Sequence, residues 1–375
     1  ALIQRVVRAL YLPWLDASAR HFQGLVEGAE DAVRAKVTGS QHEKDACLVF
    51  ADGLRYDVAG ILAERLEAMG YRVRREHRLA PLPTVTSTAK PFATLSHDQL
   101  EGGEDIVDFN PRFKNSPQAA TAQRLRDDMA GRGIDLLGED IRPAKPGTTG
   151  GWLETGKLDE LGHQLGARLA AQIDNELEML LDQVTGLLDA GWTRLRIVTD
   201  HGWLLVPGGL PHVAVPSHLT TTKWSRAATV KGDARPSVPV HAWHWNRHVR
   251  IASPPGVGSF APHTEYSHGG ISPQECIVPE LVVERGGGGG GTSASITAIT
   301  WRGMRCRVSV TTNDPSVRVD LRTSWKQAST SIAASAKEVG PAGEASLAVA
   351  DDAHEGHAAT IVVVDGAGNV LDRKP

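Results

Sequence analysis

The sequence predicts an α/β protein in which helices flank a mostly parallel sheet and a small β-sandwich follows. Three observations lead to this class. Apolar runs of strand length alternate with longer stretches of helical periodicity over the first 285 residues. Two of those runs end close to an aspartate, at the end of the strand where parallel sheets place their chemistry. After a run of glycines the pattern changes to short alternating segments separated by turn residues.

The composition is that of a globular protein with about two domains. The chain has 375 residues, 41% of them hydrophobic, and a net charge of -4 that gives no global attraction to nucleic acid. No apolar run approaches the roughly 20 residues that cross a bilayer, so no membrane association is expected. Cys47, Cys276 and Cys306 form no C-x-x-C pair, which excludes a thiolate zinc cluster and favours a reducing cytoplasm. The start has neither an initiator Met nor a signal-peptide pattern, so we expect a piece of a longer protein.

The first elements run from a helical lead-in to a hydroxyl-rich loop. Residues 1–40 have amphipathic helical spacing and precede the domain proper. A buried parallel strand is predicted over 46–50, just before Asp52. The next elements are a helix, a strand and a loop, at 57–69, 71–79 and 81–88.

The second half of this domain, predicted over 41–285, repeats the alternation. One long helix is predicted over 162–190 from its leucine spacing. A buried strand over 195–199 ends at Asp200, and two further strand candidates lie at 238–245 and 276–283.

The rest of the chain is expected to form a separate small domain. Six glycines at 286–291 predict a flexible linker. Residues 292–375 contain four strand-like runs, which predicts a β-sandwich. No group of residues there could do chemistry, so we assign this domain a packing or partner role.

Five segments carry residue types suited to chemistry. Asp159 and His163 are four apart and share one face of a helix, where they could hold one ion. Taken alone, a surface carboxylate with a capping histidine is the favoured interpretation. Asp200 and His201 follow a strand directly, so they would be rigidly held, although a turn residue beside an incidental histidine is equally plausible.

The other three segments are weaker. His268 precedes two glycines that allow close backbone approach, as would an ordinary glycine-rich turn. Asp52 ends the first strand, and Thr86 lies in a loop that also reads as simply polar. Arg55 could orient Asp52 or touch phosphate and Asp57 could anchor the turn, with a surface ion pair an equal alternative. For Lys223 and Arg226, a solvated charged loop is favoured over a role in lining a phosphate path.

The order of these segments is more informative than any one of them. Along the chain come an Asp at a strand end, a Pro-x-x-Thr loop, a D-x-x-G-H segment, a D-H-G segment after a second strand, and a late His-Gly. This order resembles the alkaline phosphatase superfamily, which implies an alkaline-phosphatase-like α/β fold. Asp159-Glu-Leu-Gly-His-Gln-Leu-Gly166 is similar to the superfamily's D-x-x-G-H-x-x-G. Three other segments resemble those that mark the PglZ domain of BREX-type phage-defence systems. They are Gly53-Leu-Arg-Tyr-Asp57, Asp200-His-Gly-Trp-Leu-Leu205 and Ser267-His-Gly-Gly-Ile-Ser-Pro-Gln-Glu275. The resemblance covers residues 45–285.

The resemblance implies a site with two divalent metal ions. It places Asp159, His163 and His268 on one ion. It places the remaining ligands on the other, namely Asp52, Asp200, His201 and the Thr86 hydroxyl. Imidazole and carboxylate ligands suit zinc, with manganese as the alternative. Two ions roughly 4 Å apart can hold both oxygens of an in-line phosphoryl displacement. Thr86 fits the Pro-x-x-Thr spacing of the nucleophile, and Thr84 or Thr88 would replace it if the register shifted.

The function implied is a phosphodiesterase acting on nucleotides or on short or single-stranded nucleic acid, alongside other BREX-type defence proteins. Two alternatives stay open: a phosphomonoesterase, and a metal-stabilised scaffold with little catalysis. A sulfatase would need C/S-x-P-x-R around its nucleophile, which no cysteine here provides. A phosphomutase would need a full cap domain, and the stretch from 92 to 152 is modest for one.

Overall fold

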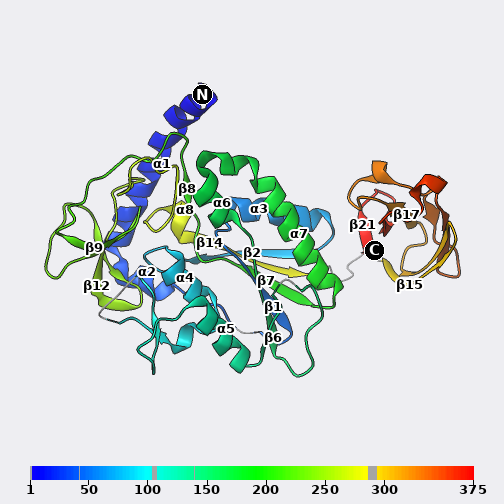
Figure 1. The fold of residues 1–375 in the computed structure, drawn as a ribbon, viewed down its shortest axis with the longest axis horizontal. Helices are drawn as coiled ribbons and strands as arrows, with labels where there is room; N and C mark the ends of the chain where they lie inside the picture. Colours follow the sequence, from blue (N-terminus) through cyan, green and yellow to red (C-terminus); the bar gives the residue numbers. More distant parts are fainter. Residues whose placement is uncertain (1, 42, 104–107, 139, 286–293) are drawn as a thin grey trace. The chain divides into compact units, whose positions relative to one another are not determined.

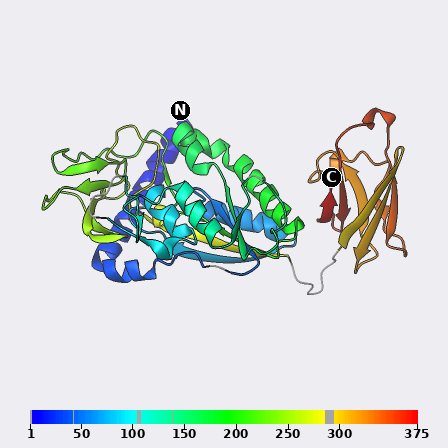
Figure 2. The same cartoon turned by 60° about the horizontal axis from the view of Figure 1, so that its bottom comes forward.

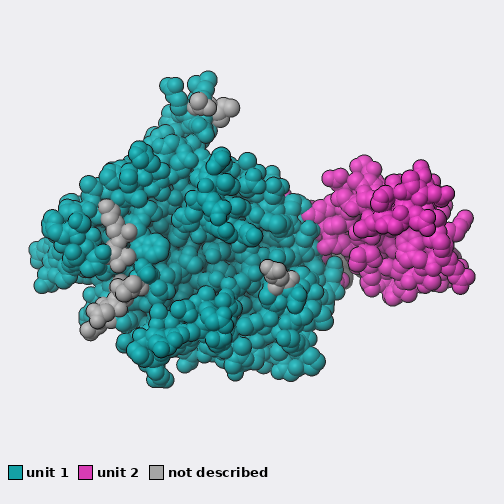
Figure 3. Space-filling view, viewed as in Figure 1, with its two compact units in different colours: residues 1–64, 73–284 teal, residues 65–72, 285–375 magenta. Residues whose placement is uncertain are grey.

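The computed structural model describes residues 2–41, 43–103, 108–138, 140–285 and 294–375. These form two compact units, residues 1–64 with 73–284 and residues 65–72 with 285–375 (Figure 3). The predicted glycine linker, 286–291, lies outside the described residues.

The first unit is built on a six-stranded sheet. Its strands, in spatial order, are β2 (Arg72–Leu79), β14 (Ile277–Glu284), β7 (Arg194–Val198), β1 (Ala46–Ala51), β6 (Gly150–Thr155) and β5 (Ile134–Leu136). The β7–β1, β1–β6 and β6–β5 pairs are parallel, and β14 runs antiparallel to β7. The predicted mostly parallel α/β class is therefore confirmed.

Helices cover both faces of this sheet (Figure 1). They are α3 (Tyr56–Ala68), α4 (Thr86–Ala93), α5 (Ala122–Gly131) and α7 (Ile173–Asp189). Every residue of β1 is buried, as expected for a strand covered on both sides. Leu48 and Phe50 share a core cluster with Ala93 of α4 and Met129 of α5.

The predicted helix over 162–190 is wrong as a single element. It is three pieces: α6 (Leu158–Leu165), a 3-10 turn η2 (Gly166–Ala171) and α7. Gly166 breaks the helix with a φ of +54°, and a Cβ there would come within 2.7 Å of the Glu265 carboxylate. Leucine periodicity continues through the break, so the pattern alone could not locate it.

The helical lead-in divides into α1 (Leu2–Gly28) and α2 (Glu30–Lys36). Leu15 and Ala19 of α1 are buried against Leu204 and Val206. Leu10 and Trp14 of the same helix are 75% and 59% exposed. None of the helices in the described ranges has the length and apolarity needed to span a bilayer.

Short strands complete the first unit (Figure 2). A four-stranded sheet has the order β11 (Val240–Trp243), β12 (Asn246–Ala252), β10 (Ala228–Val230) and β9 (Thr220–Lys223). The strand predicted over 238–245 belongs to this sheet and not to the central one. The remaining short elements are β3 (Leu100–Glu101) with β4 (Arg112–Phe113), β8 (Leu204–Leu205) with β13 (Tyr266–Ser267), η1 (His97–Gln99) and α8 (Pro273–Cys276).

The second unit contains two facing sheets. One consists of β15 (Ala294–Arg302), β16 (Arg305–Thr312) and β19 (Glu344–Ala348). The other consists of β18 (Lys337–Glu338), β17 (Arg318–Arg322), β20 (Thr360–Val364) and β21 (Val370–Lys374), with 3-10 turns η3 (Ala328–Thr330) and η4 (Asp352–His354) in the connections. One apolar core includes residues of both sheets, such as Val308 and Val363. The predicted small β-sandwich is thus confirmed.

Candidate metal centre

Two adjacent strands deliver the first pair of acidic side chains. Asp52 directly follows β1, and Asp200 lies two residues after β7. These strands are parallel neighbours, with Phe50 opposite Val198. Their carboxyl ends therefore meet at one edge of the sheet, and that edge is where open α/β sheets bind ligands.

The helix after β6 carries two further candidate ligands, a carboxylate and an imidazole. Asp159 and His163 sit one turn apart on α6, with the Asp159 Oδ1 3.6 Å from the His163 Nε2. The Tyr266 hydroxyl donates a hydrogen bond to the same Oδ1 at 2.8 Å. Gly162 makes this approach possible, since a Cβ there would meet the Tyr266 ring at 2.2 Å. The glycine of D-x-x-G-H thus has a packing reason.

His268 closes this group. Its Nε2 lies 3.3 Å from the Asp159 Oδ1 and 3.1 Å from the His163 Nε2. Its Nδ1 lies 3.0 Å from the Thr84 carbonyl oxygen, and the Nδ1 of His201 lies 3.2 Å from the Gly202 carbonyl oxygen. A backbone carbonyl that accepts from Nδ1–H leaves the Nε2 lone pair free to face a metal.

A second group lies beside the first. One ligand atom each from Asp52, Asp159 and His201 fall within 4.8 Å of one another. The His201 Nε2 lies 3.4 Å from the Asp200 Oδ2 and 3.0 Å from the Thr86 Oγ1. The rings of His201 and His268 stack 3.7 Å apart. The seven side chains singled out from the sequence therefore form one connected cluster, in which Asp159 belongs to both groups.

The three threonines near Pro83 have different surroundings. Thr86 is the first residue of α4, where the sequence pattern indicated a loop. The buried Thr84 hydroxyl donates to the Gly270 carbonyl and accepts from Gly269 N–H. The buried Thr88 hydroxyl donates to the Phe109 carbonyl at 3.0 Å. Of the three hydroxyls, only that of Thr86 lies against the cluster.

The electrostatics of the cluster favour a cation. Burial, reinforced by the Asp200 carboxylate, raises the pKa of Asp52 to about 8. Burial and the Asp159 carboxylate raise the pKa of Asp200 to about 6. The Asp52 Oδ1 and Asp200 Oδ2 are buried without a hydrogen-bond partner among the described residues. Such atoms are costly unless a cation satisfies them.

The imidazoles complete the donor set. Burial lowers the pKa values of His163 and His268, which keeps their rings neutral as metal ligation requires. Burial acts to raise the pKa of Asp159, but the neighbouring imidazoles, His268 foremost, hold it below its usual value. Neutral imidazoles beside buried carboxylates are the donors that zinc takes. The residues present therefore fit divalent metal ions.

A cavity of about 360 Å³ opens beside the cluster. Thr86 and His268 lie in its wall, together with Trp224, Asn110 and Lys90. Sequence patterns did not single out Trp224, Asn110 or Lys90 as site residues. The signal for Lys90 was present, because it lies one helical turn after Thr86 on α4. Trp224 and Asn110 come from connecting segments whose position no local pattern encodes.

Arg226 neither lines a phosphate path nor belongs to a solvated charged loop, so both interpretations considered for it are wrong. It is fully buried and neither lines the cavity nor faces solvent. Its guanidinium pairs with the Glu275 carboxylate at 2.7 and 2.8 Å. Glu275 also accepts from Gly270 N–H at 2.8 Å and from the Ser272 hydroxyl at 2.6 Å, so the pair anchors the segment that carries His268. The side chain of Lys223 lies outside the described residues.

Two roles were considered for Arg55, a functional one and a structural ion pair, and its contacts are those of the structural one. Its Nε lies 2.6 Å from the Asp57 Oδ1, and its guanidinium stacks 3.9 Å from the Trp203 ring centre. It does not line the cavity beside the cluster. This is the ion pair at the start of a helix that the sequence offered as the alternative.

No protein-family model matches the chain, and no curated protein matches it. Among solved structures, the chain is similar to murine ectonucleotide pyrophosphatase/phosphodiesterase 5, an inactive form in complex with AMP, with a TM-score of 0.41 and 13% identity. The uncomplexed murine protein gives 0.40 and 14%, and the human protein 0.38 and 13%. Each match covers 64% of this chain and 88% of the other. We therefore infer function from the side chains of the cluster and not from these neighbours.

Proposed function

We propose that the chain is a metal-dependent phosphodiesterase of the alkaline phosphatase superfamily, with Thr86 as its nucleophile. The observation that carries this proposal is the contact between the Thr86 hydroxyl and a partly buried cluster of three carboxylates and three imidazoles. A structural metal cage needs no hydroxyl at its open side. The alternative of a scaffold with little catalysis accounts for the cage but not for Thr86.

Each side chain has a role in this proposal. Asp159, His163 and His268 would hold one ion, and Asp52, Asp200 and His201 would hold the other beside Thr86. When bound, divalent ions such as zinc, or alternatively manganese, polarise the phosphoryl oxygens and neutralise the charge that develops on them. The backbone carbonyls behind His201 and His268 keep both rings oriented.

Thr86 carries out the covalent chemistry. Its oxygen, having released its proton to solvent, attacks phosphorus as the bond to one alkoxide breaks. That alkoxide leaves as an alcohol after taking a proton from solvent, and the threonine phosphodiester that forms keeps the other organic group. Water then cleaves the new bond and returns the hydroxyl. Thr86 begins α4, and the positive end of a helix dipole favours negative charge on that oxygen.

The charge of the site and the shape of the cavity support a diester substrate. Three carboxylates (Asp52, Asp159 and Asp200) with two divalent ions leave a net charge of about +1, which matches the single charge of a diester. The lining of the cavity also includes the apolar side chains of Pro91, Ala120 and Leu125 and the side chain of Trp224. A second organic group, such as the nucleoside of a nucleotide or of a short single strand, would have room there.

The proposed biological setting rests on sequence segments. Those around Asp52, Asp200 and His268 resemble segments that mark PglZ domains. We therefore place the protein in a BREX-type phage-defence system, in the cytoplasm and alongside other BREX proteins. Co-purification of the chain with such proteins from its own cells would test this.

The activity is tested by metal analysis and paired kinetics on the full chain. We expect about two divalent ions per chain and a higher kcat/KM on bis(p-nitrophenyl) phosphate than on p-nitrophenyl phosphate. Asp200→Ala should lose one ion and nearly all turnover. A higher kcat/KM on the monoester would replace the diesterase with the phosphomonoesterase alternative. Two bound ions with no turnover on either ester would favour the scaffold.

A further inference from the structure

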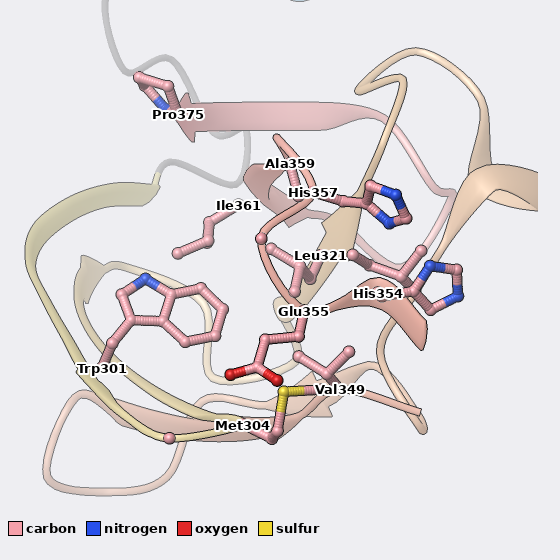
Figure 4. A pocket seen from close by; sticks show the side chains of 13 residues that line it. Trp301, Met304, Leu321, Val349, His354, Glu355, His357, Ala359, Ile361 and Pro375 are labelled. Atoms are coloured by element: carbon pink, nitrogen blue, oxygen red, sulfur yellow. The ribbon is translucent and has the colours of Figure 1, made fainter. Parts of the chain in front are cut away.

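The second unit contains a cavity of its own, of about 340 Å³. All the residues that line it come from 301–375, so it belongs to the β-sandwich alone. Figure 4 shows the indole of Trp301 on one side and the Glu355 side chain reaching into the space beside the Met304 sulfur. None of these residues belongs to the metal cluster of the first unit.

The walls of the cavity are of two chemical kinds. Leu321 and Ile361 belong to the core of the sandwich and form an apolar floor. Trp301 is 48% exposed, an unusual exposure for the largest aromatic side chain. The Glu355 carboxylate makes no hydrogen bond or ion pair with any residue that the structure describes.

The charge around the cavity is acidic on one side. Glu355 follows η4, and Asp351 and Asp352 precede it in the same connection. His354 and His357 also line the cavity, with ring centres 5.8 Å apart, and in Figure 4 they lie on the far side from Trp301. A phosphate or carboxylate ligand would meet the Glu355 charge. A purely apolar ligand would desolvate the same carboxylate without pairing it.

We infer that this cavity binds an organic cation carried on a short aliphatic stem, as in a lysine or arginine side chain. The indole face of Trp301 attracts a cation, and Glu355 accepts its hydrogen bonds. Met304 and Val349 provide contacts for the methylene groups of the stem. A quaternary ammonium ion fits less well, because it cannot donate to Glu355 and finds only one indole instead of an aromatic cage.

Methionine NMR on the full chain can test the inference. The chain has four methionines, and only Met304 lines this cavity. In protein labelled at the methionine methyl groups, titration with an acetyl-lysine or acetyl-arginine methylamide should shift the Met304 resonance saturably. The other three resonances serve as internal controls. The uncharged acetyl-norleucine methylamide, which has a similar stem, should leave Met304 in place.

Two sources of the cation are separated by a second pair of probes. Tighter binding of an acetyl-Gly-Lys-Gly amide than of n-butylamine would indicate a side chain of a partner protein. The reverse order would indicate a free small amine. Either order supports a cation site.

Variants give the decisive comparison. Glu355→Gln keeps the shape of the side chain and should weaken lysine binding about tenfold or more, as expected for a lost charge-assisted hydrogen bond. Glu338→Gln makes the same charge change on β18, outside the cavity, and should bind as the wild type does. Trp301→Leu should weaken binding as well. An unmoved Met304 resonance, an equal response to norleucine, or unchanged binding by Glu355→Gln would each overturn the inference. Asp200→Ala should bind the cation normally, so the outcome is independent of the proposed enzyme activity.

Discussion

At the scale of single residues, the hydroxyls of three threonines close in sequence have three different hydrogen-bond partners. The Thr84 hydroxyl ties down the loop after His268, the Thr88 hydroxyl bonds the Phe109 carbonyl, and the Thr86 hydroxyl alone meets His201. Their chemistry is identical, and only their direction on the fold distinguishes them. This difference makes the nucleophile assignment testable within one short segment.

We expect Thr86→Ala to lose turnover by roughly a thousandfold or more while it keeps its metal and its thermal stability, since a methyl group cannot attack phosphorus. Thr88→Val should do the opposite. It leaves the Phe109 carbonyl without its buried donor, which costs about 1–3 kcal/mol in the free energy of unfolding, yet it should keep its activity at low temperature. Diester kinetics, metal content and thermal melts separate the two outcomes. Normal turnover by Thr86→Ala would move the nucleophile elsewhere.

We expect Asp52 to lower the stability of the metal-free protein and to contribute to metal binding. Its pKa in the fold is about 8, against an ordinary value of 3.8, so the metal-free fold holds a proton that the unfolded chain releases. The metal-free protein therefore loses stability as the pH rises from about 4 through about 8.

Asp52→Asn removes this ionisation. In a chelator, the variant should be more stable than the wild type at pH 8, and this advantage should disappear at acid pH. With zinc present the order should reverse, because the wild type gains the free energy of binding two ions and the variant that of only one. Thermal melts at two pH values, with and without zinc, test both statements. A wild type as stable as the variant at pH 8 in chelator would contradict them.

At the scale of elements, the segment between β13 and α8 depends on a buried ion pair. Arg226, which lies two residues before β10 of the small sheet, also reaches the Gly256 and Gly258 carbonyls, so one guanidinium joins three segments. Its partner Glu275 bonds the backbone of Gly270, two residues after His268. We regard this pair as positioning His268.

Glu275→Gln should therefore lower the affinity for metal as well as stability. Loss of one partner of a buried pair costs about 3–5 kcal/mol, and part of that loss should appear as looser placement of His268. Asp320→Asn provides the matched control. Asp320 forms a buried pair with Arg322 in the sandwich, with an O–N distance of 2.9 Å. The Asp320→Asn substitution should destabilise the second unit and leave the metal content unchanged. Equal metal affinity in both variants would reduce the Arg226–Glu275 pair to a purely structural role.

At the scale of the whole molecule, the chain has two units with separate cores. All the candidate metal ligands lie between residues 52 and 268, whereas the core of the sandwich is formed by residues between 296 and 363. A ligand that binds only the folded form of one unit stabilises that unit alone.

Calorimetry of the full chain should accordingly show two transitions. Removal of metal with a chelator should lower one of them by several degrees, and restored zinc should raise it again. The other transition should not respond to metal. A single transition that moves as a whole would mean that the two units unfold together.

The sequence by itself determined the class of the fold and the identity of the candidate ligands. Strand-length runs that end near Asp52 and Asp200, and the four-residue spacing of Asp159 and His163, are local patterns. Local patterns fix which side chain stands at the end or on the face of an element. That is why the parallel sheet and the sandwich could be predicted before any coordinates, whereas the members of the cluster were expected from the order of the segments and its resemblance to the alkaline phosphatase superfamily.

Only the tertiary structure decided how these pieces meet. It showed that Asp159 belongs to both groups of candidate ligands, that Thr86 is the hydroxyl facing His201, and that Arg226 is buried. It also ended α6 at Gly166, where Glu265 from a distant segment fills the space a side chain would need. Each of these facts depends on distances between residues far apart in the chain. Those distances are set by the packing of whole elements, and a periodicity read over one or two turns contains no information about it.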